Sequence, residues 1–590
     1  MPSSMSWALA LMLYAVAALA FQSEREQIPL ALSNERKNVV IILTDDQDAT
    51  MDSVAYMPRL KEHIIDQGVS FANHFTTTAI CCPSRVSLWT GRQPHNTNVT
   101  DVDPPYGGFP KFIAQGLNDA YLPVWLQDAG YATYYAGKMF NSHTVNNYNA
   151  PFMAGWTANN FLLDPGTYSY LNPIYQRNHD EPIHHKGRHT TELIQEHAAQ
   201  LLDDAMDSGN PFFVALAPIA PHSNIDANDG GPPVMTEPVP LRRHADLFHD
   251  VTVPRTQSFN PDRPSGASWI AGLPRLNATS VAALDAFYRQ RLRALQGVDE
   301  LVEQVIRRLE AAGRLDDTYV IFTSDNGYHL GQHRLPPGKE CGYDEDIRVP
   351  FFVRGPGVAK GARVDAVTAH IDVAPTLFRV AGIELRSNFD GAPMPLPREV
   401  GQEEADNKDD DKNIREHVAV EYWGTAIAEG RVGGFDGNGQ IVMANNTYKA
   451  IRLKSQRRNL YYAVWCTNEH ELYDLQTDPH QMNNLYPAVR PAAAWLERLV
   501  ERLDSLMMVM KSCKGVTCRQ PWDVLHPPKT VKDGDRVRSL DDALHPRFDA
   551  FYAAQARVSF SRCEPGYIPS SEGPQVGYQY KGSLGWSRWA

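Results

Sequence analysis

The stretch Val39-Val40-Ile41-Ile42-Leu43 is a short, β-branched apolar run, and the acidic pair Asp45-Asp46 follows it after a single threonine. An unbroken apolar run of this length is typical of a strand that is buried on both faces of a parallel sheet. The polar pair stands where that strand should stop. The segment therefore predicts a buried strand with two carboxylates at its carboxyl end.

Three more segments share this design, and amphipathic helical stretches lie between them. Tyr131–Tyr135 precedes Gly137-Lys138, Phe212–Leu216 precedes His222, Tyr319–Phe322 precedes Asp325-Asn326, and the helical stretches are Thr191–Met206 and Ala283–Ala311. Alternating buried strands and helices predict an α/β fold with a large, mainly parallel sheet flanked by helices. Ligands collect beyond the carboxyl ends of such strands, so the four polar groups should converge on one edge.

A chain of 590 residues is too long for one ordinary core, so we expect several structural units. The predicted units are a catalytic domain over 35–397, an acidic loop or linker over 398–414, a smaller C-terminal α+β domain over 415–512 and a C-terminal extension over 513–590. Strand-like pieces and one helix indicate the smaller domain, at Val418–Tyr422, Gln440–Met443, Tyr448–Leu453 and Ala492–Val509.

The stretch Arg398–Lys412 is charged and nearly free of apolar residues. Such a composition cannot bury a core, so we interpret it as a solvated loop or linker. The alternative is a calcium site, but the stretch lacks a turn-forming glycine pattern.

The net charge of −13 and the pI near 5.9 argue against nucleic acid or an anionic membrane as partner, because the acidic excess repels both. Trp7–Phe21 is a continuous apolar run with small residues before Ala20, which predicts a signal peptide over 1–20. The alternative is a membrane anchor, but the run is shorter than the roughly 20 residues that a spanning helix needs. We expect a protein of the secretory lumen, the cell wall or the exterior, without stable membrane insertion. N-glycosylation candidates are Asn98, Asn277 and Asn445.

The seven cysteines are an odd number, which leaves one without an intramolecular partner in an oxidising compartment. Cys513 and Cys518 are close enough in sequence to predict a local disulfide. The pairing of Cys82, Cys341, Cys466 and Cys563 stays open at this level.

The segment Cys81-Cys82-Pro83-Ser84-Arg85-Val86-Ser87-Leu88-Trp89-Thr90-Gly91 predicts a helix that starts near Pro83 and ends at Gly91. Cys81 then lies at the helix N-terminus, where the N–H groups and the helix dipole favour an anion. Arg85 lies one turn along the same face. A cysteine in this place should have a lowered pKa and be reactive. The alternative is a structural disulfide cysteine.

These residues resemble the signature of the type-I sulfatase family, C-x-P-S-R-x(4)-T-G, at every fixed position. The family belongs to the alkaline-phosphatase-like superfamily. The resemblance implies that a formylglycine-generating enzyme converts Cys81 to formylglycine, whose hydrate attacks sulfur, and that Arg85 supports it. Removing Cys81 from the thiols leaves an even number of cysteines.

The pairs Asp45-Asp46 and Asp325-Asn326 supply hard oxygen ligands at one sheet edge, which suits Ca²⁺, or Mg²⁺ with a more demanding geometry. They match the family's motifs, here Leu-Thr-Asp-Asp-Gln and Ser-Asp-Asn-Gly. The resemblance implies that all four residues ligate the cation, together with a sulfate oxygen and the modified Cys81.

Three basic residues, Lys138, His222 and Lys339, match positions where sulfatases place catalytic and sulfate-binding groups. The chain departs from the family pattern Gly-Lys-x-His, because Phe140 stands where many members have histidine. Asn141 or His143 could contribute from the same loop.

The resemblance extends over roughly Asn38 to Leu485, and the closing segment around Cys513–Cys518 is most similar to fungal arylsulfatases. It implies hydrolysis of sulfate monoesters, with aryl sulfates as the expected class of small-molecule substrate. The alternatives are a carbohydrate sulfatase of the N-acetylglucosamine-6-sulfate type, a phosphate or phosphonate ester hydrolase of the same superfamily, and an inactive secreted binding protein on the same scaffold.

Overall fold

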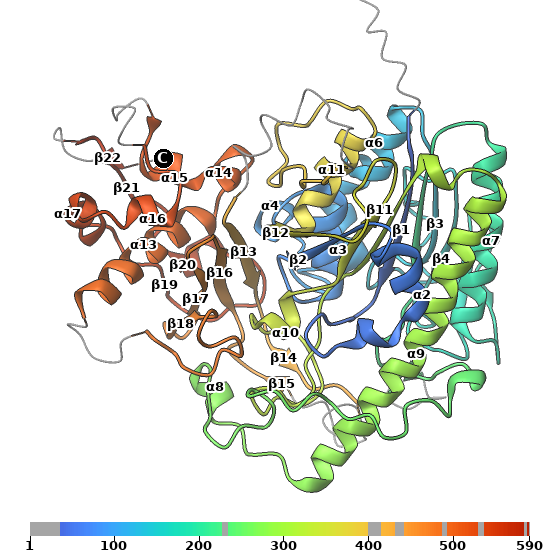
Figure 1. Cartoon of the computed structure of the whole chain (residues 1–590), viewed down its shortest axis with the longest axis horizontal. Helices are drawn as coiled ribbons and strands as arrows, with labels where there is room; N and C mark the ends of the chain where they lie inside the picture. The colour runs from blue at the N-terminus through green and yellow to red at the C-terminus, as the bar shows by residue number, and fades with distance from the viewer. Residues whose placement is uncertain are drawn as a thin grey trace, which may run out of the picture. The chain divides into compact units, whose positions relative to one another are not determined.

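Four strands predicted from the sequence lie side by side in the middle of a ten-stranded sheet (Figure 1). They are β1 (Asn38–Thr44), β3 (Ala132–Lys138), β7 (Phe212–Ala217) and β10 (Thr318–Ser324). β1 runs parallel to β10 on one side and to β7 on the other, and β7 runs parallel to β3. All four strands therefore end at the same edge of the sheet, as the sequence predicted.

The sheet is parallel at its centre and mixed towards its margins. Its strand order is β12-β2-β11-β10-β1-β7-β3-β4-β5-β6. Antiparallel pairs join β10 to β11, β11 to β2, β4 to β5 and β5 to β6, whereas β12 pairs with β2 and β3 pairs with β4 in parallel. The remaining strands of this sheet are β2 (Val69–Phe75), β4 (Ala158–Leu162), β5 (Ile174–Arg177), β6 (Ile183–His184), β11 (Phe351–Arg354) and β12 (Ala362–Ala369).

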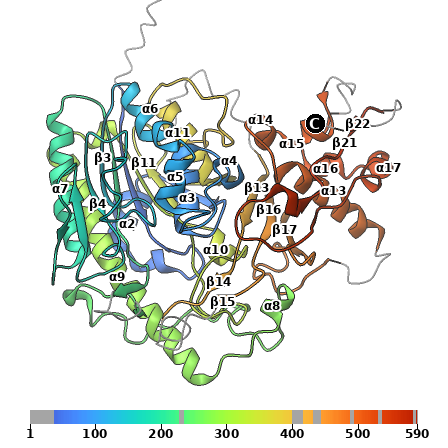
Figure 2. The same cartoon turned by 180° about the vertical axis from the view of Figure 1, so that it is seen from behind.

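Helices cover both faces of the sheet, because the side chains of β1 point alternately into two hydrophobic cores. Val39 and Ile41 pack in the core that includes α3 (Cys81–Thr90), α5 (Gly108–Ala114), α6 (Leu122–Asp128) and α11 (Val373–Val380). Val40 and Ile42 pack in the core that includes α7 (Thr190–Asp207) and α9 (Ala278–Ala311). Figure 2 shows α3, α5, α6 and α11 on the face opposite α7 and α9. The predicted class, a large α/β sheet flanked by helices, is confirmed.

The helix α9 begins five residues before the predicted start at 283. Asn277 caps it, since its side-chain oxygen accepts a hydrogen bond from the backbone N–H of Ser280 at 2.9 Å. An asparagine cap satisfies one of the free N–H groups of the first turn, which stabilises the earlier start. The other long helix, α7, agrees with the predicted range within one residue.

The fold is described from a computed structural model, for residues 36–226, 234–398, 415–430, 442–486, 493–528, 536–582 and 587–588. The predicted signal peptide over 1–20 lies outside the described residues, and so does the acidic segment from 399 to 414.

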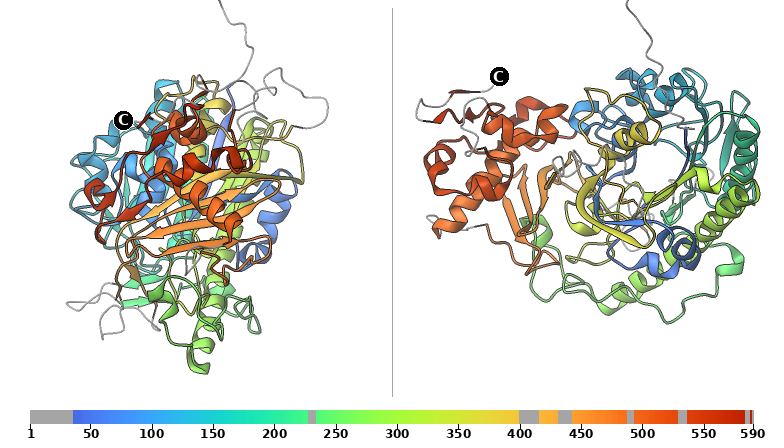
Figure 3. Two further views of the ribbon diagram at one scale, coloured as in Figure 1. Left: turned by 90° about the vertical axis from the view of Figure 1, so that its left-hand side faces the viewer. Right: turned by 45° about the horizontal axis from the view of Figure 1, so that its top comes forward.

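A second, antiparallel sheet is built by the C-terminal part of the chain. Its order is β13 (His417–Tyr422), β16 (Tyr448–Lys454), β17 (Asn459–Trp465) and β18 (His470–Asp474). Figure 3 shows these strands, in orange, beside the helices of the C-terminal region. The core between them includes Ile451, Leu503 from α13 (Ala494–Met510) and Trp522 from α15 (Pro521–Leu525). A smaller C-terminal α+β region is therefore present, and residues beyond 513 contribute to its core.

Short elements complete the described chain. The short helices are α2 (Pro58–Leu60), α4 (Pro94–Thr97), α8 (Ser268–Ala271), α10 (Asp344–Ile347), α14 (Val516–Arg519), α16 (Leu540–Ala543) and α17 (Asp549–Ala553). Four two-stranded ribbons pair β8 (Asn224–Asp226) with β9 (Val234–Thr236), β14 (Ala426–Ile427) with β15 (Val442–Met443), β19 (Ser559–Phe560) with β20 (Glu572–Gly573) and β21 (Tyr578–Gln579) with β22 (Ser587–Arg588).

Candidate active site

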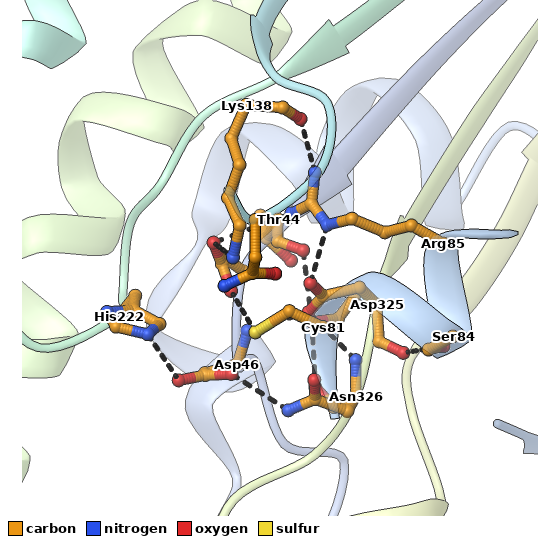
Figure 4. A network of polar contacts seen from close by, with 12 residues as sticks. Thr44, Asp46, Cys81, Ser84, Arg85, Lys138, His222, Asp325 and Asn326 are labelled. Atoms are coloured by element: carbon orange, nitrogen blue, oxygen red, sulfur yellow. Dashed lines mark hydrogen bonds and ion pairs between the residues drawn. The ribbon is translucent and has the colours of Figure 1, made fainter. Parts of the chain in front are cut away.

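The polar groups predicted to follow the four central strands meet at one edge of the sheet (Figure 4). Lys138, the last residue of β3, donates a hydrogen bond from Nζ to Asp45 Oδ2 at 2.6 Å. His222 Nε2, from the loop after β7, lies 3.6 Å from Asp46 Oδ2. Asn326 Nδ2 donates to Asp46 Oδ1 at 2.8 Å. The parallel register of the strands thus brings together residues that are far apart in the sequence.

The backbone at Asp46 has a left-handed conformation, with φ of 67°. This conformation is uncommon for a residue other than glycine and needs support from its surroundings. The Asp46 N–H donates to Asp325 Oδ1 at 3.0 Å, and the Arg291 guanidinium of α9 donates to the Asp46 carbonyl. These contacts hold the turn after β1 so that both carboxylates face the same space.

Cys81 lies at the first position of α3, as predicted, and Gly91 ends that helix in the left-handed conformation with φ of 67°. The Cys81 thiol points between two opposite charges: Sγ lies 3.5 Å from Asp45 Oδ1, and Lys339 Nζ lies 3.3 Å from Sγ. The side chain is buried. Residue 81 is therefore placed among the acidic and basic groups that the strand ends supply.

The prediction that the Cys81 thiol has a lowered pKa is wrong. Burial raises its pKa far above the ordinary value, and the nearby carboxylates Asp45 and Asp325 add to this, while Lys138 and Lys339 only partly oppose it. The helix N-terminus favours an anion, but removal of the thiolate from water costs more here. Unmodified Cys81 is consequently a protonated thiol at neutral pH.

Arg85 joins two of the carboxylates. Its Nε donates to Asp325 Oδ2 at 2.8 Å, and Nη2 lies 3.5 Å from Asp45 Oδ2. The same guanidinium donates to the backbone carbonyl of Lys138. One turn of α3 separates Arg85 from Cys81, as the spacing predicted, so the arginine fixes the carboxylates around the thiol.

Two lysines bring positive charges into this cluster of carboxylates. Lys339 Nζ donates to both oxygens of Asp46, at 2.6 and 2.8 Å. Burial alone would lower the pKa of Lys339, but the negative charge of Asp46 and its neighbours raises it well above the ordinary value. The pKa of Lys138 is raised in the same way by Asp45, and burial of Asp45 is outweighed by the charge of Lys138 so that its pKa is lowered. All three groups are thus ionised at neutral pH.

The residues fit a divalent cation. Ligand atoms of Asp45, Asp46, Cys81 and His222 lie within 4.8 Å of one another. Asn326 Oδ1 is buried and has no hydrogen-bond partner among the described residues, which marks an acceptor without a donor. Carboxylate and amide oxygens are the ligands that Ca²⁺ prefers. Asp45, Asp46 and Cys81 of the predicted ligand set therefore lie together with His222, and metal binding by Asp325 and Asn326 stays a prediction.

The loop after β3 supplies a different residue from the one in the common sulfatase pattern. Phe140 is buried against Phe112 in the hydrophobic core. Asn141 Nδ2 donates to the hydroxyl of Tyr168 at 2.6 Å, and the Tyr168 ring stacks on His222 at 4.2 Å. Asn141 therefore reaches the site through a tyrosine.

His143, the other candidate from this loop, is placed in an apolar environment. Its ring packs on Phe109 at 4.3 Å, and burial lowers its pKa to about 3. Neither ring nitrogen has a hydrogen-bond partner within the described chain. His143 is a neutral core residue.

The sequence analysis did not identify three residues that contribute to this site. Arg291 occupies the apolar stripe of α9 between Tyr288 and Leu295, so a charge within that stripe was a usable signal. Tyr168 lies under Lys138 Nζ, 4.6 Å from the ring centroid, and carries no motif. Glu429 lies 3.6 Å from Lys339 Nζ and belongs to the C-terminal part of the chain, where no pattern pointed to the site.

The cysteines outside the site are partly paired. The predicted disulfide Cys513–Cys518 is present, and a second one joins Cys466 to Cys563 across 97 residues. Cys82 and Cys341 are buried free thiols. The even number left after Cys81 is set aside therefore gives two disulfides.

The glycosylation candidates differ in exposure. Asn277 and Asn445 are exposed, whereas Asn98 is half-buried. Their modification stays a prediction. Within the described ranges, none of the helices has the length and apolarity required to cross a bilayer.

Comparison with known proteins agrees with this geometry. The family model described as Sulfatase matches residues 37–383, which is more than half of the chain. The chain belongs to the sulfatase family. Members of this family are sulfuric ester hydrolases, and the site described above lies within the matched residues except for Glu429.

Two relatives and one solved structure extend the sulfatase match. The chain is 37% identical to an arylsulfatase of Volvox carteri over 91% of this chain and 83% of the relative. It is 31% identical to the N-acetylglucosamine-6-sulfatase of Capra hircus, over 83% of this chain and 86% of the relative. The structure of BT4656 in complex with its substrate D-glucosamine-2-N,6-O-disulfate superposes with a TM-score of 0.60 at 21% identity, over 77% of this chain and 94% of that one. This last similarity supports the fold.

Proposed function

We propose that this sulfatase hydrolyses sulfate monoesters of phenols, with residue 81 as nucleophile after conversion of Cys81 to formylglycine. The observation that carries the proposal is the position of the Cys81 side chain between the Asp45 carboxylate and the Lys339 ammonium, at 3.5 and 3.3 Å. The arylsulfatase relative supports phenols as the leaving group.

The raised pKa of the Cys81 thiol supports the need for this conversion. A protonated, buried thiol is a poor nucleophile, because the thiolate is the reactive form. Formylglycine supplies a hydrated aldehyde, whose hydroxyl group attacks sulfur. A dedicated formylglycine-generating enzyme is the maturation partner that this proposal requires.

The charged side chains take the remaining catalytic roles. Asp45, held ionised by Lys138, accepts the proton of the attacking hydroxyl. Lys339 stabilises negative charge on the sulfate oxygens. The S–O ester bond breaks as His222 or Lys138 gives a proton to the departing phenol oxygen. The sulfate, now bound to residue 81, leaves as the second hydroxyl of the hydrate loses its proton and the aldehyde re-forms.

Asp45, Asp46, Asp325 and Asn326 would hold a Ca²⁺ ion, with Mg²⁺ as the alternative. When bound, the cation supplies Lewis-acid stabilisation of the sulfate oxygens. The unpaired Oδ1 of Asn326 and the ionised Asp45 support this assignment.

A carbohydrate sulfate is the second candidate substrate, because the goat N-acetylglucosamine-6-sulfatase is also a relative over most of the chain. The apolar run over 7–21 and the two disulfides support secretion, since disulfides persist in oxidising compartments.

The test uses protein from a host that makes formylglycine. Mass spectrometry of the peptide with residue 81 should show the aldehyde in place of the thiol. Initial rates on an aryl sulfate, on N-acetylglucosamine 6-sulfate and on an aryl phosphate should be highest for the aryl sulfate. A preference for the phosphate, or full activity with an unmodified thiol, would contradict the proposal.

A further inference from the structure

Glu429 is a buried carboxylate beside the sulfate-binding lysine. Its Oε1 lies 3.6 Å from Lys339 Nζ, while Oε2 accepts hydrogen bonds from Ser223 Oγ at 2.7 Å and from the Tyr328 hydroxyl at 2.9 Å. The Glu429 N–H donates to the carbonyl of Pro337 at 2.7 Å, which anchors its backbone to the loop that carries Lys339. The residue thus connects three loops of the site.

This carboxylate is ionised in the folded protein. Burial would raise its pKa, but the charges of Lys339 and His222 and the hydroxyl donors Ser223 and Tyr328 lower it to about 2. A group that carries a full negative charge this close to an anion-binding lysine must weaken the attraction of the site for anions. Its presence at a sulfate site therefore needs a reason.

The charges of the site show what Glu429 changes. The cations Arg85, Lys138 and Lys339 face the carboxylates Asp45, Asp46 and Asp325, so these six charges cancel. Arg291 and Asp48 form a separate pair at 3.9 Å. A bound divalent cation would add two positive charges to this balance, and the Glu429 carboxylate would offset one of them.

We propose that Glu429 is a specificity-determining residue, which matches the net charge of the site to a monoanionic sulfate ester and disfavours the dianion of a phosphate monoester. This inference rests on the proposed function. It also gives a reason for preferring sulfate on a scaffold that suits tetrahedral anions in general.

The physical basis is the difference in substrate charge. A sulfate monoester carries one negative charge, whereas a phosphate monoester carries two above its second pKa of about 6. Repulsion by a fixed carboxylate grows in proportion to the ligand charge. Loss of the Glu429 charge should accordingly favour phosphate more than sulfate.

A purely positioning role for Glu429 makes a different prediction. If the carboxylate only held Lys339 in place, its loss would weaken both esters by the same factor, because both need that ammonium group. The ratio of the two activities separates these roles.

The experiment compares the wild-type enzyme with Glu429→Gln, both with formylglycine and Ca²⁺, at pH 8. We expect the ratio of kcat/KM for an aryl phosphate to kcat/KM for the matching aryl sulfate to rise about tenfold or more. Calorimetric binding of phenylphosphonate, a dianion at pH 8, and of benzenesulfonate, a monoanion, should shift in the same direction, which measures selectivity without turnover. Glu429→Ala repeats the test without an amide next to Lys339, in case the first variant folds poorly.

Two variants serve as controls. Glu429→Asp keeps the charge and should leave the ratio within about twofold of wild type, as judged against the tenfold effect expected for charge loss. Glu421→Gln removes another buried carboxylate, which pairs with Lys449 at 2.7 Å, and should leave the ratio unchanged. Equal loss of both activities in Glu429→Gln and Glu429→Ala, or an unchanged binding ratio, overturns the inference. Absence of sulfatase activity in formylglycine-containing wild type would instead contradict the proposed function.

Discussion

Two buried charge clusters in this molecule look alike in composition and differ in organisation. The active-site cluster contains Asp45, Asp46, Arg85, Lys138 and Lys339, all nearly inaccessible to solvent. The second, which we call the C-terminal charge cluster, consists of Glu421, Lys449, His95 and Glu572. Burial of charge is costly in both, so each must be compensated.

In the C-terminal charge cluster, the buried carboxylate of Glu421 is paired with two basic side chains. Glu421 accepts hydrogen bonds from Lys449 Nζ at 2.7 Å and from His95 Nδ1 at 2.8 Å. The Lys449 ammonium also lies over the ring of Trp423 at 4.2 Å. This arrangement joins the C-terminal sheet to the helix α4, and none of its four residues is a cysteine.

The active-site cluster, by contrast, surrounds a reactive side chain. It surrounds the Cys81 thiol, includes an uncommon backbone conformation at Asp46 and leaves Asn326 Oδ1 without a partner among the described residues. Buried ion pairs alone therefore do not identify a functional site. An incomplete set of partners around a reactive side chain is the better sign.

The largest expected effect tests which cluster carries the chemistry. Cys81→Ala should lower kcat/KM for an aryl sulfate by about 10⁴-fold or more, because loss of a nucleophile removes the reaction pathway. Initial rates measure it. Cys341→Ala removes another buried free thiol and should keep activity per folded molecule. A comparable loss of activity in both variants would show that the reaction has no special need for residue 81.

The next prediction concerns the C-terminal charge cluster. Glu421→Gln should lower the free energy of unfolding by about 3–5 kcal/mol, because it leaves Lys449 buried without its main partner. Urea denaturation measures the change. The kcat of the remaining folded protein should stay at the wild-type value, and a large fall in kcat would break the distinction between the clusters.

A pH titration sharpens the same distinction. Burial would raise the pKa of Glu421, but the charges of His95 and Lys449 lower it to about 2 from the ordinary 4.5. A carboxyl with a lowered pKa stabilises the fold above its unfolded pKa and loses this contribution as the pH falls to its folded pKa. The stability difference between wild type and Glu421→Gln should hence shrink by about 3 kcal/mol from pH 5 to pH 2. A difference that is constant with pH would contradict it.

The smallest expected effect is the loss of the cation. Chelation should lower sulfatase activity about a hundredfold, because the ion contributes a few kcal/mol to transition-state stabilisation. Added Ca²⁺ should restore the rate and raise the Tm of wild type and of Glu421→Gln alike. If chelation changed only the Tm, the cation would be structural.

Much of this site could be predicted because its residues follow buried strands. The runs that end at Asp45, Lys138, His222 and Asp325 indicate strands by composition, and parallel strands share their carboxyl edge. Cys81 and Arg85 were placed by a helix with a proline near its start and a glycine at its end. Local patterns were sufficient wherever a residue's place depends on its own element.

The sequence by itself determined the α/β class, the family signature and the residues at the strand ends, since these depend on short-range patterns of apolar and polar side chains. Only the tertiary structure decided the raised pKa of Cys81 and the entry of Arg291, Tyr168 and Glu429 into the site. The physical reason is that burial and Coulomb interactions act through space: Lys339 and Glu429 lie 90 residues apart in the chain, and the fold brings their charges within 3.6 Å.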